Sequence, residues 1–183
     1  IYPQMGNRFY IKIIKRIEHT GLISALYEGF KSSIGEYLLV MDADFSHDPK
    51  DLNRLIKAAW QKDLVIGSRY IPGGAVDNWN AHRRMLSRLG NMYARLITGL
   101  PISDLTAGFV VYKRNLLSKI LESGVNTEGY AYQMEMKYLA LNFGASFSEV
   151  PITFIDRTEG KSKLNQGVVV EGIIAPWVLR FSK

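Results

Sequence analysis

Short apolar runs alternate along the chain with longer segments in which apolar residues recur at helical spacing. The runs have the length and β-branched content of strands, and they cover Tyr10–Lys15, Glu36–Met41, Leu64–Ser68, Gly108–Tyr112 and Phe147–Phe154. The amphipathic segments predict helices over Gly21–Ser33, Pro49–Trp60, Asn80–Leu100, Asn115–Leu121, Tyr130–Asn142 and Val168–Phe181. Strands that alternate with helices are typical of an α/β fold. We therefore predict a mostly parallel central sheet with helices on both faces.

The long segment Asn80–Leu100 carries two stripes at helical spacing. The apolar stripe consists of Met85, Leu89, Met92 and Leu96. The basic stripe consists of Arg84, Arg88 and Arg95. Residues three, four or seven apart lie on one side of a helix, so each stripe forms its own face. We predict that the apolar stripe faces the core and that the basic one faces solvent.

Composition narrows the range of functions. The 183 residues have the length of a single domain, and no repeat or linker divides them. The net charge of +6 favours an anionic partner such as a phosphorylated substrate or an acidic membrane surface. No motif that reads nucleic acid accompanies the cations, so we expect no nucleic acid as partner. The absence of cysteine excludes disulfides, thiolate metal ligands and cysteine nucleophiles.

The C-terminal segment, residues 166–183, is amphipathic. Glu171, Pro176 and Arg180 interrupt its apolar run, so we do not expect it to cross a membrane. An apolar face with Trp177 and flanking cations suits a membrane interface. Packing on the same domain, or the start of a truncated membrane region, would give the same pattern.

Two carboxylates one residue apart, Asp42 and Asp44, directly follow an apolar strand. The carboxyl ends of strands are where α/β sheets bind ligands, and such a pair can hold one hard cation together with substrate phosphates. A calcium-binding loop is excluded, because its required glycine and glutamate are replaced by His47 and Asn53. The pattern predicts a metal–diphosphate site formed by Asp42, Asp44 and the hydroxyl of Ser46.

Cations follow two other strands. Arg69 comes just after Leu64–Ser68, at the edge of the sheet where the aspartates are expected, and a structural salt bridge is the alternative role. Residues Asp156–Lys163 mix Gly and Ser with three cations, as in a loop that folds over phosphate, although an exposed charged loop would look alike.

Other kinds of catalytic site find little support. The three histidines His19, His47 and His82 lack the spacing of metal ligands. The chain contains neither a Walker phosphate-binding loop nor a serine-hydrolase elbow. Glu135 is a possible general base, but a structural glutamate explains it better.

In their order along the chain, these features resemble the polyprenol-phosphate (dolichol-phosphate) mannosyltransferases of glycosyltransferase family 2. The resemblance covers roughly residues 20 to 175. The matching stretches are Met41–His47, Gly67–Tyr70, Gly73-Gly74, Asn78-Trp79, Ser87-Arg88, Asp104–Gly108, Gly129-Tyr130, Gln133–Glu135, Glu149–Ile152, Asp156-Arg157 and Gly160–Leu164. It implies the nucleotide-sugar-binding fold called GT-A.

The resemblance implies a reaction: inverting, metal-dependent transfer of mannose from GDP-mannose to polyprenol or dolichol phosphate. It places the protein peripherally on the cytoplasmic face of a membrane. Asp42 and Asp44, with the backbone at Met41 and Ala43, would meet the diphosphate, and Asp44 with Ser46 would hold Mg²⁺ or Mn²⁺. The implied phosphate-binding cations are Arg69, Arg157, Lys163 and either Arg84 or Arg83. Asp44, Arg69 and Arg157 would carry catalysis.

The chain departs from the family at its beginning. The family's N-terminal strands, which hold the base and the ribose, have no counterpart before Gly21. We therefore expect the later two-thirds of a catalytic domain. The donor stays open as a result, and UDP-glucose or another nucleotide sugar is the alternative. A non-catalytic relative that binds membranes or anions is the alternative from a different class.

Overall fold

A four-stranded sheet forms the centre of the computed structural model, which describes residues 4–5, 9–16, 21–127, 131–156 and 166–181. In sheet order its strands are β3 (Tyr37–Val40), β6 (Val110–Lys113), β4 (Leu64–Ser68) and β7 (Phe147–Pro151). Strand β6 is antiparallel to both of its neighbours, whereas β4 and β7 are parallel. Three strands therefore run in one direction, but most of the neighbouring pairs are antiparallel. The predicted α/β fold is confirmed, as a mixed sheet.

Two small sheets accompany the central one. Strands β1 (Gln4–Met5) and β2 (Phe9–Tyr10) pair antiparallel, and β5 (Ala75–Asp77) pairs parallel with β8 (Thr153–Ile155). The predicted strand Tyr10–Lys15 is wrong, because residues 11–16 have no regular structure.

The predicted strand Phe147–Phe154 is divided at Ile152. The backbone N–H of Ile152 donates to the carbonyl of Ser68, and its carbonyl accepts from the N–H of Ala75, each at 3.0 Å. One residue thus passes the chain from the central sheet into the small β5–β8 sheet.

The helices agree closely with the amphipathic segments. They are α1 (Leu22–Ser32), α2 (Leu52–Ala59, after a 3₁₀ turn at Pro49–Asp51), α3 (Ala81–Thr98), α4 (Arg114–Glu122), α5 (Ala131–Asn142) and α6 (Gln166–Phe181). Helix α3 begins after Asn80, whose side chain accepts the N–H of Arg83, and ends at Gly99 with φ 72°. A helix in the predicted C-terminal segment is confirmed.

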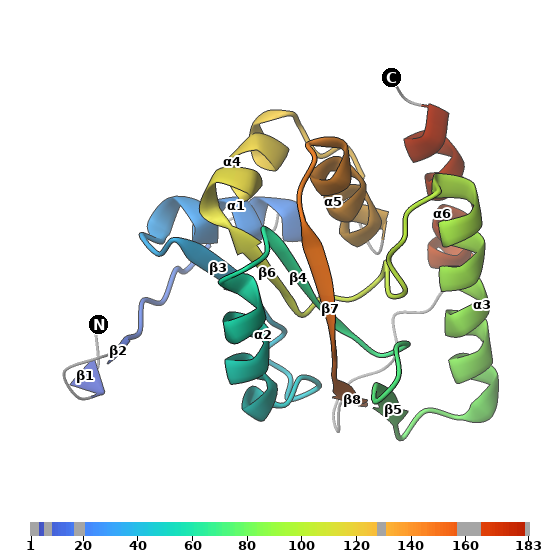
Figure 1. The fold of residues 1–183 in the computed structure, drawn as a ribbon, viewed down its shortest axis with the longest axis horizontal. Helices are drawn as coiled ribbons and strands as arrows, with labels where there is room; N and C mark the ends of the chain where they lie inside the picture. The colour runs from blue at the N-terminus through green and yellow to red at the C-terminus, as the bar shows by residue number, and fades with distance from the viewer. Residues whose placement is uncertain (1–3, 6–8, 17–20, 128–130, 157–165, 182–183) are drawn as a thin grey trace.

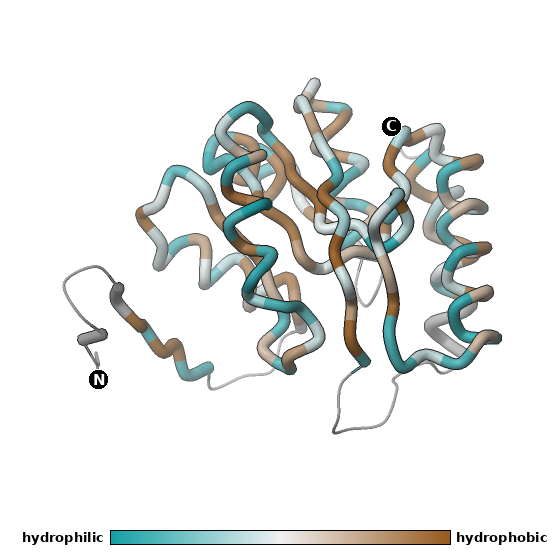
Figure 2. Tube along the Cα trace, turned by 60° about the horizontal axis from the view of Figure 1, so that its bottom comes forward, coloured by the Kyte–Doolittle hydropathy of each residue, from teal (hydrophilic) through white to brown (hydrophobic). Residues whose placement is uncertain are grey.

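Helices cover both faces of the central sheet, as predicted (Figure 1). On one face, Leu55 and Ala59 of α2 pack with Val65, Phe109 and Val111. On the other, α1, α4 and α5 pack against the alternate residues of the same strands. The two central strands are therefore apolar on both sides, and hydrophobic residues are concentrated on them in Figure 2.

The predicted core stripe of α3 is wrong. Met85, Leu89, Met92 and Leu96 are 56, 48, 54 and 77% exposed. The residues of α3 that are buried are instead the small or polar Asn91, Ala94 and Thr98. They lie on the side that meets the loop before β6, where a close approach and hydrogen bonds are required. Apolar periodicity located the helix but not its buried side.

A tight turn after β4 brings Gly74 against backbone. A Cβ at Gly74 would lie 2.7 Å from the carbonyl oxygen of Ser68 and 2.8 Å from the carbonyl carbon of Arg69. These atoms belong to the strand end that carries the candidate site, so the turn has no room for a side chain.

We predict that Gly74→Ala lowers the free energy of unfolding by about 1–3 kcal/mol, because the backbone must shift to accept the methyl group. Gly90→Ala is the control: Gly90 lies inside α3 with nothing within 4 Å of its Cβ position. It should stabilise the helix by about 1 kcal/mol. Urea unfolding followed by circular dichroism measures both, and equal effects would contradict the crowded turn.

Candidate active site

The two aspartates lie in a tight loop after β3. Asp44 Oδ1 accepts hydrogen bonds from the backbone N–H of Ser46 at 3.1 Å and from its hydroxyl at 2.5 Å. Phe45 adopts φ 62°, in the left-handed region, and is 86% exposed. Asp42 is exposed and Asp44 is half-buried. The Asp44 carboxylate is thus fixed by Ser46, while Asp42 is the more exposed residue of the pair.

Ser46 is 1% exposed, and its hydroxyl donates to Asp44. The structure therefore shows Ser46 orienting Asp44, and its direct contact with a metal stays a prediction. Met41 and Ala43, whose backbone was expected to meet the diphosphate, are both exposed in this loop.

His47 fixes the backbone of the acidic loop. Its Nδ1 accepts the N–H of Asp42 at 3.2 Å, so the ring is neutral with its proton on Nε2. The ring is 3% exposed and stacks on Phe109 with a centroid distance of 4.8 Å. Burial lowers the pKa of His47, although the carboxylates of Asp42 and Asp44 act in the opposite direction. The neutral form that this hydrogen bond requires is therefore favoured.

Arg69, just past the end of β4, forms a buried ion pair with Asp104. Its Nε and Nη2 donate to the two carboxylate oxygens of Asp104, each at 2.7 Å, and its backbone N–H donates at 3.0 Å. Arg69 is 7% exposed and Asp104 is 0% exposed. Burial alone would raise the pKa of Asp104, but the Arg69 guanidinium and its hydrogen bonds hold that pKa below the ordinary value. The salt-bridge alternative for Arg69 is therefore present, and its contact with phosphate stays a prediction.

The segment Asp104–Gly108 is tied down from several helices and strands. Glu149 of β7 accepts the backbone N–H groups of Ser103 and Asp104. Asn91 of α3 accepts the N–H of Leu105 at 2.8 Å. The segment ends at Gly108, where an added Cβ would lie 3.6 Å from Asp42 Oδ2. It therefore extends from the partner of Arg69 to the side of Asp42.

Lys137 of α5 holds the same segment from inside. Its Nζ donates to the carbonyls of Leu105, Ala107 and Gln133 at 3.0, 2.8 and 3.1 Å, and the side chain is 0% exposed. Burial lowers the pKa of Lys137 to about 7, against the opposite influence of Asp104.

A second cationic group gathers around Trp79. The guanidinium of Arg83 lies 4.0 Å from the centre of the Trp79 ring, and its Nη1 donates to Asp156 at 2.8 Å. The Arg83 Nε and Trp79 Nε1 atoms are buried donors with no acceptor among the described residues. Arg84, by contrast, is exposed and binds the carbonyl of Trp79. Of the two predicted alternatives, the structure brings Arg83 into the cluster.

Aromatic rings join the acidic loop to the cations. Phe154 meets His47 edge-on at 5.5 Å and Trp79 at 5.7 Å, and the Arg69 guanidinium lies 5.5 Å from its ring centre. Through His47 and Phe154, the loop of Asp42 and Asp44 is thus connected to the cluster of Arg69, Trp79 and Arg83. Within the described ranges, no group of three or more His, Asp or Glu side chains forms a metal site.

Glu135 has a structural role, as expected. It is 5% exposed, and its carboxylate accepts the backbone N–H groups of Asn126 and Thr127 and the Thr127 hydroxyl. With these bonds made inside the fold, it holds Asn126 and Thr127 against α5 and is not presented as a base.

Arg157, Lys163 and His19 lie outside the described residues. His82 is exposed on the first turn of α3. Asp156, the last described residue before Arg157, is bound to Arg83, so the chain enters that predicted phosphate-binding loop from the cationic cluster.

Sequence reasoning missed the roles of Asp104, Lys137, His47 and Asn91. Their signal was present but weak: each is a polar residue inside an otherwise apolar or motif-bearing stretch. Buried polar groups need partners, so such residues indicate an internal network. Which partners they have depends on contacts between residues far apart in sequence.

Comparisons with known proteins agree on one family. Residues 3–121 match the family model described as Glycosyl transferase family 2. The chain is 38% identical over 167 residues to the undecaprenyl-phosphate mannosyltransferase of Micrococcus luteus, covering 90% of this chain and 69% of that protein. It is 42% identical over 176 residues to the polyprenol monophosphomannose synthase of Mycolicibacterium smegmatis, covering 93% and 66%. The chain thus spans about two-thirds of these relatives.

Solved structures support the fold. A structure described as a mycobacterial protein matches with a TM-score of 0.63 at 16% identity, over 93% of this chain and 54% of that one. Glucosyl-3-phosphoglycerate synthase from Mycobacterium tuberculosis, in complex with Mn²⁺, UDP-glucose and phosphoglyceric acid, matches with a TM-score of 0.58 at 16% identity, over 87% and 54%. At these identities the likeness shows a shared GT-A architecture.

The buried ion pair yields a stability prediction. Asp104→Asn keeps the shape but removes the charge that Arg69 requires, so we expect a loss of about 3 kcal/mol or more in unfolding free energy. Asp63→Asn is the matched control: Asp63 is partly exposed, lies 3.9 Å from Lys113, and accepts two hydrogen bonds from Ser146 that an asparagine oxygen can also accept. Its cost should be about 1 kcal/mol or less. Chemical denaturation of both variants measures the two losses in unfolding free energy. Similar losses would contradict the importance of the buried pair.

Proposed function

Because this chain belongs to glycosyltransferase family 2, we propose that its protein transfers mannose from GDP-mannose to the phosphate of a polyprenol lipid. The observation that carries the proposal is the contact of His47 with Phe154, which joins the loop of the paired carboxylates to the arginines. Such a site suits two anionic substrates. The names of the two curated relatives support mannose as the sugar and polyprenol phosphate as the acceptor.

The carboxylate pair fits a divalent metal. Asp42 is exposed, and Asp44 is oriented by the Ser46 hydroxyl. Mg²⁺ is commonly held by one or two carboxylates together with substrate phosphates, and Mn²⁺ prefers similar oxygen ligands. When bound, the ion offsets the negative charge on the nucleoside diphosphate as it leaves. The structural relative bound to Mn²⁺ and UDP-glucose supports a metal-dependent donor site.

The Arg83 cluster fits the acceptor phosphate. Arg83 Nε and Trp79 Nε1 are buried donors without an acceptor among the described residues, and a phosphate oxygen that reached this cluster would supply one. Arg69 has its charge balanced by Asp104, so it positions the cluster more than it adds charge. We assign Arg157 and Lys163 to the two phosphates on the basis of the family resemblance, and Arg84 to the outer edge of the acceptor site.

The reaction then requires no protein base. A phosphate monoester oxygen, already ionised near neutral pH, attacks the anomeric carbon of mannose as the bond from that carbon to the diphosphate oxygen breaks. The electron pair leaves with GDP, and the anomeric configuration is inverted. Asp42 and Asp44 hold the donor end, while Arg83, positioned by Arg69, holds the acceptor end. The rate enhancement comes mainly from positioning and electrostatics.

A lipid acceptor calls for a membrane-facing surface, and α3 with α6 offers one. The two helices contact each other along one side of the molecule (Figure 1). Trp177 Nε1 donates to the Tyr93 hydroxyl at 2.7 Å, and that hydroxyl donates to the carbonyl of Ile173. Beside this link lie exposed apolar residues of both helices, which are Met85, Leu89, Met92, Leu96, Ile173, Trp177 and Phe181. We call these seven residues the α3–α6 apolar face.

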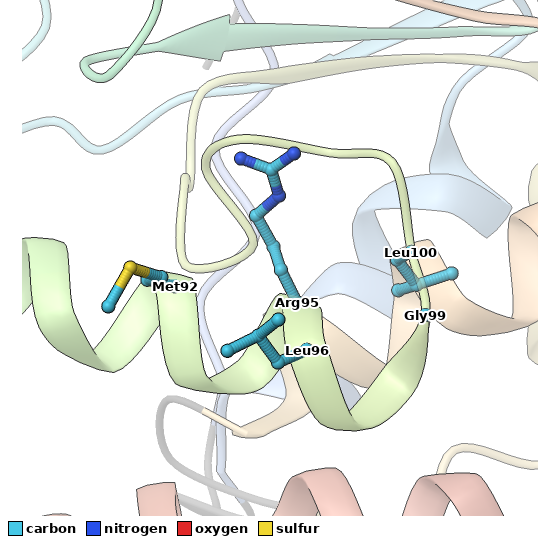
Figure 3. A pocket seen from close by; sticks show the side chains of 5 residues that line it. All are labelled: Met92, Arg95, Leu96, Gly99 and Leu100. Atoms are coloured by element: carbon cyan, nitrogen blue, oxygen red, sulfur yellow. The ribbon is translucent and has the colours of Figure 1, made fainter.

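Cations border the α3–α6 apolar face. An open hollow of about 480 Å³ at the end of α3 is lined by Met92, Arg95, Leu96, Gly99 and Leu100 (Figure 3). Arg95 extends from the helix toward the segment after Leu100, and Arg180 of α6 lies close to Gly99. Apolar residues edged by cations suit a bilayer of anionic lipids. In the described ranges, no helix is both long and apolar enough to span a membrane.

We predict that Asp44→Asn lowers transfer from GDP-mannose to polyprenol phosphate by at least about a hundredfold, because charge stabilisation at the leaving diphosphate is lost. Labelled lipid product is measured with and without Mn²⁺ or Mg²⁺. Asp51→Asn, on the 3₁₀ turn before α2, is the control and should retain full activity. Undiminished transfer by Asp44→Asn would exclude its metal role. Faster turnover of UDP-glucose would identify the alternative donor.

The membrane surface gives a second prediction. The double variant Leu89→Ser and Leu96→Ser should bind vesicles that contain anionic phospholipid at least about tenfold more weakly. Each leucine contributes about 1.5–3 kcal/mol to the binding free energy when the bilayer buries it. Trp60→Ser is the control: Trp60 is 67% exposed but lies at the end of α2. Cosedimentation with vesicles measures binding. Equal losses in both proteins, or no loss in the leucine variant, would contradict the proposed face.

A further inference from the structure

Lys137 is a fully buried lysine to which the proposed reaction gives no part. Most lysines stay at the surface, because burying an ammonium group is costly unless it is paired or hydrogen-bonded. The ammonium group has three donors, and three carbonyls accept them: Leu105, Ala107 and Gln133. Every donor is therefore satisfied without a carboxylate in direct contact.

Two of these carbonyls belong to the Asp104–Gly108 segment, which reaches both halves of the site. At one end, Asp104 binds Arg69 through both carboxylate oxygens. At the other end, a Cβ on Gly108 would lie 3.6 Å from Asp42 Oδ2 and 3.9 Å from His47 Cε1. The position of the segment therefore sets the spacing between the cations and the acidic loop.

We propose that Lys137 is a positioning residue that holds the Asp104–Gly108 segment against the acidic loop and thereby aligns Asp42 with the metal–diphosphate site. This inference rests on the proposed function only in taking Asp42 and Asp44 as the metal-binding pair. Lys137 touches neither substrate nor metal. It acts through hydrogen bonds to the backbone carbonyls of Leu105 and Ala107. No side-chain substitution within the segment can take the place of these bonds.

Charged groups around Lys137 act on it in both directions. Asp104 and Glu149 attract the ammonium group, and Arg69 repels it. Glu149 accepts the N–H groups of Ser103 and Asp104, so it fixes the start of the segment while Lys137 fixes its middle. Two side chains from β7 and α5 thus hold one loop from two directions.

The test compares Lys137→Met with Lys119→Met. Lys119 is an exposed lysine on α4, the helix that packs on α5. Amide hydrogen exchange, measured by mass spectrometry without ligand, should become at least tenfold faster over Leu105–Gly108 and over Asp42–His47 in Lys137→Met. Neither region should change in Lys119→Met. Affinity for GDP in the presence of Mn²⁺, measured by calorimetry, should fall at least tenfold in Lys137→Met alone.

Lys137→Gln, whose amide has two donors, is the second variant and should fall between wild type and Lys137→Met in both measurements. Faster exchange confined to Leu105–Gly108 would overturn the proposal, because the acidic loop would then be independent of the segment. Losses of affinity that simply follow the thermal midpoints of the two variants would also overturn it. A wild type that binds Mn²⁺ and GDP but transfers no mannose would refute the proposed function and leave this inference intact.

Discussion

Two buried charges, the guanidinium of Arg69 and the carboxylate of Asp104, join the end of β4 to the segment that leads into β6. Burying either alone would be prohibitive, so each is stable only while the other is in place. The pair therefore couples the chain just past β4 to a loop that neighbours Asp42. The cations and the acidic loop keep a fixed relation because this pair cannot open without exposing a charge to an apolar interior.

The elements of the fold were largely predictable, because they depend on local periodicity. The strand Leu64–Ser68 was predicted at its observed bounds, and α3 to within two residues at each end. The antiparallel course of β6 was not predictable, since nothing in Gly108–Tyr112 records which strands it will lie between. The prediction of the buried side of α3 failed for a related reason. A helix that packs on a polar loop presents Asn91 and Ala94 to it, and a search for large apolar residues selects the opposite side.

The candidate site was likewise predictable only in part. Asp42 and Asp44 were found from sequence because their spacing and their position after a strand carry the chemistry. Arg83 and Trp79 needed the fold, which turns the first part of α3 toward Phe154. The role of Arg69 changed most: a cation at a strand end looked available to phosphate, whereas its two carboxylate contacts are made by a residue 35 positions later. Spacing along the chain cannot reveal such a partner.

The main chain of Ile152 links two sheets. Its N–H and its carbonyl are bonded to two different sheets, so the small sheet that carries Asp77 and leads to Asp156 is fastened to β4 through main-chain atoms. These main-chain hydrogen bonds do not depend on the identity of the neighbouring side chains. Side chains of β5 and β8 can therefore alter the shape presented to a substrate while these main-chain hydrogen bonds stay in place.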